Sequence, residues 1–300
     1  MALRYDTISF MSDYGHTDEF VGVVHSVIRQ LAPGALVIDI THEVPPYDVR
    51  AGGLTLGRCA QYLAPGVVLA VVDPGVGSQR RPIAVEVGDG QSVLIGPDNG
   101  VLAAAVAVAG GATRAVWLNN PEYQLASAGS LFDGRDIFAP AAAHLCNGVP
   151  FEDLGELIST ASLLPGTLPI PEQTDEGLVV EVLWIDHYGN VQLNADPAEV
   201  DALGDVFTVR SDSTSRTVRR VGSFSEIGTG AVGMVTDSYG ALALVCNQAS
   251  AAEEFRVETE DPLTLSDLGG SEQESGAGRS EQSDVTTPVR LSTAPGRIAR

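Results

Sequence analysis

The chain is 300 residues long and 44% hydrophobic; this suits one or two domains with a sizeable core and excludes a disordered or fibrous protein. The chain has 39 acidic residues and 17 arginines but no lysine, so its formal net charge is −22. Such an acidic chain disfavours binding to nucleic acids or anionic membranes. We therefore expect a globular protein that binds neither nucleic acids nor membranes.

The cysteines, Cys59, Cys146 and Cys246, stand singly in apolar surroundings. Their spacing suggests neither a disulfide framework nor a cysteine metal site. The N-terminal residues lack the pattern of a signal peptide, and the chain has no stretch of about 20 uncharged apolar residues. These features predict a soluble, cytoplasmic protein.

The first half of the chain alternates short apolar runs with helical patterns, which is typical of an α/β domain. One helix is expected after Thr17, its predicted N-cap, with Phe20, Val24 and Ile28 on its apolar face. The other predicted elements are strands over residues 7–11, 35–40, 67–72, 83–87, 92–95 and 114–118, and helices over residues 49–63, 99–109 and 135–146. Residues 1–163 are therefore predicted to form an α/β domain with a central, mostly parallel sheet.

The second half changes character after a Pro-rich segment, residues 164–175, which we interpret as a linker. Short strands joined by Gly- and Asp-containing turns follow, and they predict a small antiparallel β-barrel-like domain over residues 176–261. The predicted strands cover residues 179–185, 191–194, 206–210, 217–221, 232–235 and 241–246. Residues 262–300 lack aromatic side chains and are predicted to be a disordered tail.

Polar residues follow several of the predicted strands, where packing alone would not place them. Asp13 follows the first strand, Asp73 the third, and Asp186 lies between two strands of the second domain, while Asp98 and Asp133 precede helices. Each has a purely structural explanation, such as a helix cap or a hairpin turn. Ligands of α/β sheets nevertheless bind at the carboxyl ends of the strands.

Together, these motifs resemble one family. In chain order they are Phe10-Met11-Ser12-Asp13-Tyr14-Gly15, Pro45-Pro46-Tyr47-Asp48-Val49, Val72-Asp73-Pro74-Gly75-Val76-Gly77, Gly96-Pro97-Asp98-Asn99-Gly100, Phe132-Asp133-Gly134-Arg135-Asp136, Ile185-Asp186-His187-Tyr188-Gly189-Asn190 and Ser238-Tyr239-Gly240. The chain resembles the SAM hydroxide adenosyltransferases, which form adenosine from S-adenosylmethionine (SAM) and are relatives of the fluorinase and chlorinase. The resemblance covers about residues 5–257 and does not extend over the predicted tail.

The resemblance implies a homotrimer that binds SAM between neighbouring subunits. Asp13 would accept hydrogen bonds from the ribose 2′ and 3′ hydroxyls. The other implied binding residues are Asp18, Asp186 and Ser238 for the methionine part, Asn190 and the backbone near Asn247 and Gln248 for adenine, and Tyr47 and Phe132 as apolar walls around the nucleoside.

The same matching implies that Asp73 and Arg80 position the attacking water. The halogenases carry Tyr where this chain has Asp73, and a carboxylate there would repel a halide and accept a proton. The related hydrolases carry His immediately before Gly-Arg-Asp, where this chain has Asp133. With two carboxylates beside one arginine, either Asp73 or Asp133 could be the base.

We therefore expect hydrolysis of SAM to adenosine and L-methionine, without metal or cofactor. Three alternatives stay open: halogenase-type transfer of another nucleophile, a SAM- or nucleoside-binding sensor without turnover, and a divalent-metal hydrolase that uses Asp73, Asp133 and Asp136. Product analysis with chloride present, ligand binding without adenosine release, and sensitivity to chelators would distinguish them.

Overall fold

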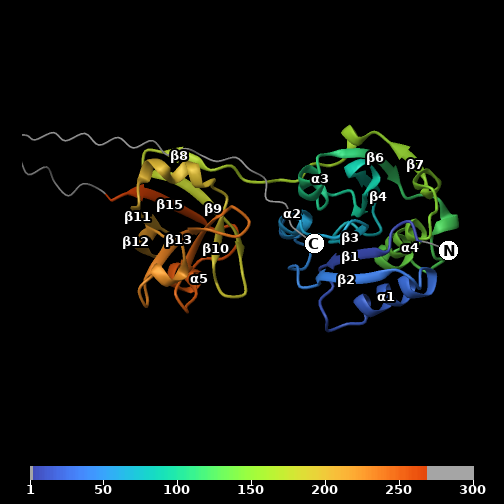
Figure 1. The fold of residues 1–300 in the computed structure, drawn as a ribbon, viewed down its shortest axis with the longest axis horizontal. Helices are drawn as coiled ribbons and strands as arrows, with labels where there is room; N and C mark the ends of the chain where they lie inside the picture. The colour runs from blue at the N-terminus through green and yellow to red at the C-terminus, as the bar shows by residue number, and fades with distance from the viewer. Residues whose placement is uncertain (1–2, 269–300) are drawn as a thin grey trace, which may run out of the picture. The chain divides into compact units, whose positions relative to one another are not determined.

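The computed structural model describes residues 3–268, and an α/β domain with a seven-stranded sheet forms the N-terminal part (Figure 1). The strand order is β2-β1-β3-β5-β4-β6-β7. The strands are β1 (Thr7–Ser12), β2 (Leu36–Thr41), β3 (Val67–Val71), β4 (Pro82–Val87), β5 (Ser92–Pro97), β6 (Ala112–Trp117) and β7 (Glu156–Ile158). Strands β2, β1, β3 and β5 pair in parallel, whereas β4, β6 and β7 extend the sheet antiparallel. The predicted α/β architecture is confirmed.

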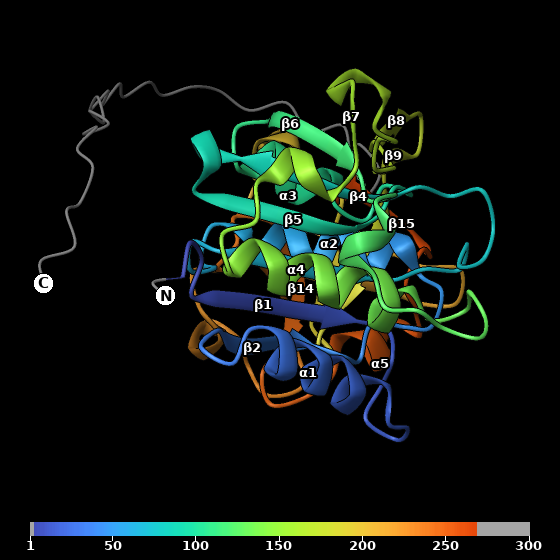
Figure 2. The ribbon, with the colours of Figure 1, turned by 90° about the vertical axis from the view of Figure 1, so that its right-hand side faces the viewer.

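Helices cover both faces of this sheet (Figure 2). The helices α1 (Phe20–Leu31) and α4 (Ala139–Cys146) share one core with Ile8 and Phe10 of β1. On the opposite face, α2 (Val49–Ala60) and α3 (Ala103–Val108) pack against the alternate strand residues, such as Met11 and Val68. Among the described helices, none has the length and apolar character needed to cross a membrane.

The parallel strands place the chain's polar loops at a common edge. Asp13 follows β1 and Asp73 follows β3, and these two strands are parallel neighbours. The loop after β6 leads into a π-helical turn, Gly134–Phe138, that runs directly into α4. Single π-helical turns occur frequently at functional sites. The position of this turn, directly after Asp133, therefore makes the edge that carries Asp13 and Asp73 a candidate functional site.

The C-terminal part is a closed β-barrel, drawn in yellow to orange in Figure 1. Its strand order is β10-β14-β13-β12-β11-β15-β9, and pairing of β9 with β10 closes it. The strands are β9 (Gly177–Ile185), β10 (Val191–Leu193), β11 (Val206–Arg210), β12 (Ser215–Arg220), β13 (Val232–Thr236), β14 (Leu242–Cys246) and β15 (Pro262–Asp267), with the short helix α5 (Ala251–Phe255) after β14. The pairs are antiparallel except β12 with β13, and the interior is apolar.

Several predicted boundaries differ from the structure. The disordered tail is predicted to begin at residue 262, but Pro262–Asp267 is strand β15, which pairs with both β9 and β11 and buries Leu263 and Leu265. Residues 269–300 of that prediction lie outside the described residues. Within the predicted linker, β8 (Glu172–Thr174) pairs with β9. The predicted cap Thr17 is also wrong, because Glu19 occupies the N-cap position of α1 and makes no side-chain capping bond.

Candidate active site

Two carboxylates and one guanidinium form a compact centre at the polar edge of the sheet. Arg80, in the loop between β3 and β4, donates from Nε to Asp73 Oδ1 at 3.0 Å and from Nη2 to Asp73 Oδ2. The same Nη2 donates to Asp133 Oδ2 at 2.7 Å. The predicted catalytic residues therefore meet, although 53 positions separate Arg80 from Asp133 in the chain.

This centre is shielded from solvent. The exposed side-chain fractions of Arg80, Asp73 and Asp133 are 8%, 6% and 11%. The guanidinium also lies over the ring of Phe138, 5.5 Å from its centroid. Its Nη1 is buried and has no hydrogen-bond partner among the described residues. Because a buried unpaired donor is costly, this nitrogen is suited to a water or a ligand oxygen.

Burial raises the pKa of Asp73, and the neighbouring charge of Asp133 adds to this, although the positive charge and hydrogen bonds of Arg80 oppose it. The net pKa lies above the ordinary value for an aspartate. A carboxylate whose pKa moves towards neutrality becomes a stronger proton acceptor. Asp73 therefore combines a fixed orientation with the basicity that proton removal from water requires.

Aromatic side chains line the centre. The ring of Tyr14 packs edge to face on Phe132 at 5.7 Å between centroids, and Phe20 contacts both rings. Burial, together with the charges of Asp13 and Asp73, raises the pKa of Tyr14 and keeps its hydroxyl protonated. The predicted wall residue Phe132 is thus part of a larger apolar surface beside the carboxylates.

Glycine is required where the π-turn meets this aromatic surface. A Cβ on Gly134 would overlap the hydroxyl oxygen of Tyr14 and would lie 3.2 Å from Phe132 Cε2. The backbone of the turn can therefore approach Tyr14 closely only because residue 134 has no side chain.

Asp13 and Tyr47 meet in a second part of the site. The backbone N–H of Tyr47 donates to Asp13 Oδ2 at 2.9 Å, and Tyr47 has a left-handed φ of 68°. The Tyr47 side chain itself is exposed. Burial raises the pKa of Asp13 although this hydrogen bond opposes the shift. The carboxylate of Asp13 retains acceptor sites for a ligand's hydroxyls.

The barrel carries its own group of predicted binding residues. Asp186 Oδ1 accepts from the backbone N–H groups of Tyr188 and Asn190, both at 2.9 Å, and Asp186 Oδ2 accepts from Asn190 Nδ2 at 2.7 Å. These bonds shape the turn between β9 and β10. The structural explanation of this motif, a hairpin turn, is therefore correct, and the same hydrogen bonds fix the orientations of the Asp186 and Asn190 side chains.

Ser238 lies in the exposed turn between β13 and β14. The predicted adenine-contacting residues follow β14: Asn247 donates from Nδ2 to the carbonyl of Ile227 at 3.0 Å, and Gln248 adopts a left-handed φ of 58°.

The predicted binding residues thus fall into two separate groups. Within residues 3–268, no hydrogen bond or ion pair joins the group around Asp73 to the group around Asp186, and Asp18 makes no side-chain hydrogen bond or ion pair. Sequence reasoning missed Tyr14 and Phe20 as site residues. Tyr14 follows Asp13 directly in the motif, which is a usable signal. Phe20 is predicted on the apolar face of α1, but its side chain is exposed.

The acids of the centre do not form a set of metal ligands. Arg80 lies between Asp73 and Asp133, while Asp136 pairs with Arg135 at 2.6 Å. In the described part of the chain, the side chains whose metal-ligating atoms converge belong to His25, Asp39 and His42. This geometry disfavours the metal-hydrolase alternative at the Asp73 centre.

The fold and this buried carboxylate–guanidinium centre define a two-domain enzyme, an α/β domain followed by a closed barrel. Residues 8–155 match the N-terminal domain of the SAM hydroxide adenosyltransferases, and residues 180–264 match the C-terminal domain. The chain belongs to this family.

Individual relatives agree with that assignment. A protein of Salinispora tropica named (R)-S-adenosyl-L-methionine hydrolase is 41% identical over 258 residues, which cover 86% of this chain and 97% of the relative. A Thermus thermophilus protein of the same name is 36% identical over 266 residues, covering 86% and 98%. A crystal structure of an uncharacterized conserved protein from Thermotoga maritima superposes with a TM-score of 0.78 at 32% identity, covering 86% and 99%. Fluorinases match at lower identity, 26% for that of Nocardia brasiliensis.

Proposed function

We propose that this protein hydrolyses SAM to adenosine and L-methionine by direct attack of water on the ribose C5′. The observation that carries the proposal is the buried Asp73–Arg80 pair, which offers an oriented proton acceptor beside an unpartnered N–H at Arg80 Nη1. The names of the hydrolase relatives from Salinispora tropica and Thermus thermophilus support the same reaction.

In this mechanism a water molecule accepts a hydrogen bond from Arg80 Nη1 and donates one to Asp73. Its oxygen attacks C5′ as the C5′–S bond breaks, and the bonding electron pair remains on sulfur. The sulfonium becomes the neutral thioether of methionine, and the proton of the water passes to Asp73. Because the leaving group already carries a positive charge, it needs no protonation, and the enzyme contributes mainly orientation in a water-restricted site.

We assign the base to Asp73 rather than to Asp133. The carboxylate of Asp73 is held by two hydrogen bonds from Arg80, and burial raises its pKa, whereas the carboxylate of Asp133 accepts one hydrogen bond from Arg80. Asp133 then serves to orient the guanidinium.

Substrate binding is divided between the two groups of residues. Asp13 accepts the ribose hydroxyls, with Tyr47 and Phe132 as walls around the nucleoside. The remaining assignments follow the family motifs: Asp18, Asp186 and Ser238 for the methionine part, Asn190 and the backbone at Asn247 and Gln248 for adenine.

We further propose that the active form is a homotrimer in which each site joins Asp13 and Asp73 of one subunit to Asp186 and Asn190 of the next. The two groups belong to different domains: Asp13 and Asp73 follow strands of the α/β sheet, whereas Asp186 and Asn190 lie in the turn between β9 and β10 of the barrel. Mixing inactive Asp73→Asn and Asp186→Ala subunits should restore activity in about a quarter of the sites of randomly mixed trimers, since a head-to-tail interface pairs domains from neighbouring subunits. A mixture as inactive as its parents would contradict a shared site.

The free cysteines, two of them buried, suit a reducing compartment, so we propose a cytoplasmic location. The mechanism requires no metal or cofactor. The reaction is tested by incubating purified protein with SAM and identifying the products by mass, using the two sulfonium epimers separately because the relatives are named for the (R) form. Adenosine and methionine are expected. A chlorinated nucleoside formed in the presence of chloride, or tight SAM binding without adenosine release, would contradict the proposal.

A further inference from the structure

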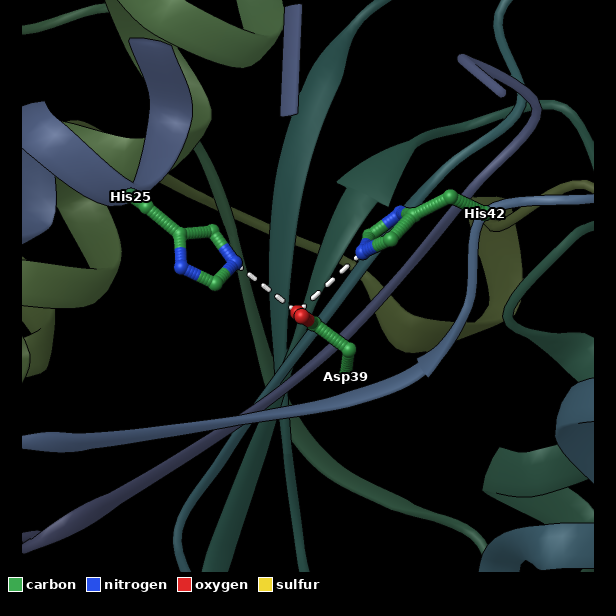
Figure 3. Close-up of side chains that lie close together, drawn as sticks. All are labelled: His25, Asp39 and His42. Carbon is green, nitrogen blue, oxygen red and sulfur yellow. Dashed lines mark hydrogen bonds and ion pairs between the residues drawn. The ribbon is translucent and has the colours of Figure 1, made fainter. Parts of the chain in front are cut away.

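A second polar cluster lies at the edge strand of the α/β sheet, outside the site described above. It joins His25 of α1, Asp39 of β2 and His42, which follows β2 directly (Figure 3). Asp39 Oδ1 lies 2.8 Å from His25 Nε2 and 3.1 Å from His42 Nε2. Figure 3 shows both imidazole rings directed at this one carboxylate.

A β-bulge in strand β2 brings the side chains of Asp39 and His42 to the same face of the sheet. Phe10 of β1 is the register partner of Asp39, but the next residue, Met11, is the partner of Thr41, so Ile40 is an extra residue in β2. Such a bulge changes the alternation of side chains along a strand. The ring of Phe10 then packs against both imidazoles, with centroids 5.9 Å from His25 and 4.5 Å from His42.

His42 is unusual for a buried histidine. Its side chain is 0% exposed, and Nδ1 forms a hydrogen bond with Ser12 Oγ at 2.7 Å. Its Nε2 has no hydrogen-bond partner that satisfies the geometry, although it faces Asp39. Since buried polar atoms nearly always have partners, this nitrogen requires an explanation. A lone pair on Nε2, with Nδ1 held by another residue, is the arrangement of a metal-ligating histidine.

The other two ligand atoms suit the same role. The three ligand atoms lie within 4.8 Å of one another, so modest rotations of His25 and Asp39 would let them surround one ion. The side chains of His25 and Asp39 are 35% and 41% exposed, which leaves an open side for water to complete the coordination. Two imidazole nitrogens and one carboxylate oxygen favour zinc and similar first-row ions over Mg²⁺ or Ca²⁺, which prefer oxygen ligands.

We propose that His25, Asp39 and His42 form a binding site for a divalent transition-metal ion, with Zn²⁺ as the best-suited ion. The site shares no residue with the Asp73–Arg80 centre, so it is not the metal site weighed for a metal-dependent hydrolase. It departs from the expectation, drawn from the sequence, that the chain binds no metal. Its ligands tie the edge strand β2 to helix α1, and Ser12 holds His42 from the end of β1.

The test is a calorimetric titration of untagged full-length protein, first stripped with a chelator and dialysed, using Zn²⁺ and Mg²⁺ separately. We expect one Zn²⁺ per chain and no comparable binding of Mg²⁺. Asp39→Asn and His25→Gln should each weaken Zn²⁺ binding at least about tenfold, by analogy with the losses seen when even outer-shell partners are removed. Both residues are partly exposed, so these variants test the site without emptying a buried position, as a change at His42 would.

The matched control is His187→Gln, which removes an exposed histidine outside the cluster and should bind Zn²⁺ like the unmodified protein. As a second readout, Co²⁺ should give a visible absorption band that is lost in Asp39→Asn and His25→Gln and kept in His187→Gln. Absence of Zn²⁺ binding, equal binding of Mg²⁺, or unchanged Zn²⁺ affinity in both ligand variants would overturn the proposal.

Discussion

Arg80 donates two parallel hydrogen bonds to Asp73, from Nε to Oδ1 at 3.0 Å and from Nη2 to Oδ2, in a setting where both side chains are less than a tenth exposed. Two parallel bonds fix the plane of the carboxylate as well as its position. Burial meanwhile raises the pKa of that carboxylate. The pair therefore supplies an oriented base whose geometry is set before substrate binds.

Asp73→Asn should keep SAM affinity and lose turnover. The amide cannot accept the proton of the attacking water, and removal of a general base typically lowers kcat by about 10²- to 10⁴-fold. Calorimetric SAM binding and single-turnover kinetics would separate the two effects. The control is Asp98→Asn, which removes the charge of a buried aspartate paired with the partly exposed Arg81 and should leave kcat nearly unchanged. Full activity of Asp73→Asn would refute the assignment of the base.

The pH dependence of the unmodified enzyme should agree with the same assignment. Since the pKa of Asp73 is raised, protonation on acidification removes the base, so kcat/KM should fall as the pH drops through a value above the ordinary aspartate pKa of about 4. Because the substrate's sulfonium charge does not titrate in this range, the acid limb reports on the enzyme. A flat profile down to pH 4 would contradict a raised pKa at the base.

Asp133→His distinguishes the two carboxylates. If Asp133 only orients Arg80, histidine should retain or raise activity, because histidine is the residue that the family resemblance leads us to expect there. Asp133→Asn should likewise lose much less activity than Asp73→Asn. If instead both Asp133 variants lose as much kcat as Asp73→Asn, the purely orienting role that we assign to Asp133 is wrong.

Gly134→Ala should impair catalysis through Tyr14. The new Cβ overlaps the Tyr14 hydroxyl, so the tyrosine or the π-turn that follows Asp133 must move. A displacement of about 1 Å in a catalytic site can cost roughly 10²-fold in rate. Adding Tyr14→Phe removes the overlapping oxygen and should restore part of the activity.

The matched control for Gly134→Ala is Gly22→Ala in helix α1, where an added Cβ meets nothing within 4 Å. It should preserve kcat and slightly raise the melting temperature, because alanine is the better helix residue. Equal kcat losses in Gly134→Ala with and without Tyr14→Phe would show that the overlap with the Tyr14 hydroxyl is not the cause.

Two truncations test the corrected boundary of the barrel. A chain ending at residue 268 keeps β15 and should retain its melting temperature and SAM turnover, since residues 269–300 lack aromatic side chains. A chain ending at residue 261 loses β15, the strand that joins β9 to β11, and should unfold at a much lower temperature. Similar melting temperatures for the two chains would mean that β15 does not stabilise the barrel.

The sequence predicted the parts of the site that local motifs encode. Asp13 and Asp73 each follow an apolar strand, and parallel pairing of those strands places both at one edge of the sheet. The prediction that Arg80 and Asp133 share one site rested on the family motifs, because no local sequence pattern relates residues so far apart in the chain.

Other features became apparent only from the coordinates. The His25–Asp39–His42 cluster arises from the bulge at Ile40, which strict alternation along a strand does not predict. Strand β15 was missed because Pro262–Asp267 is rich in polar residues, although the alternation of Leu263 and Leu265 was a usable signal. Tyr14 was missed because its role depends on contact with Gly134 across the fold.

The most direct test of the central claim is hydrolysis of SAM in water enriched in oxygen-18, followed by mass spectrometry of the products. Attack of water on C5′ places the new oxygen on the nucleoside, so the account predicts one labelled oxygen at the 5′ position of adenosine and none in methionine. Adenosine without label would contradict direct attack of water at C5′ and, with it, the role assigned to Asp73 and Arg80.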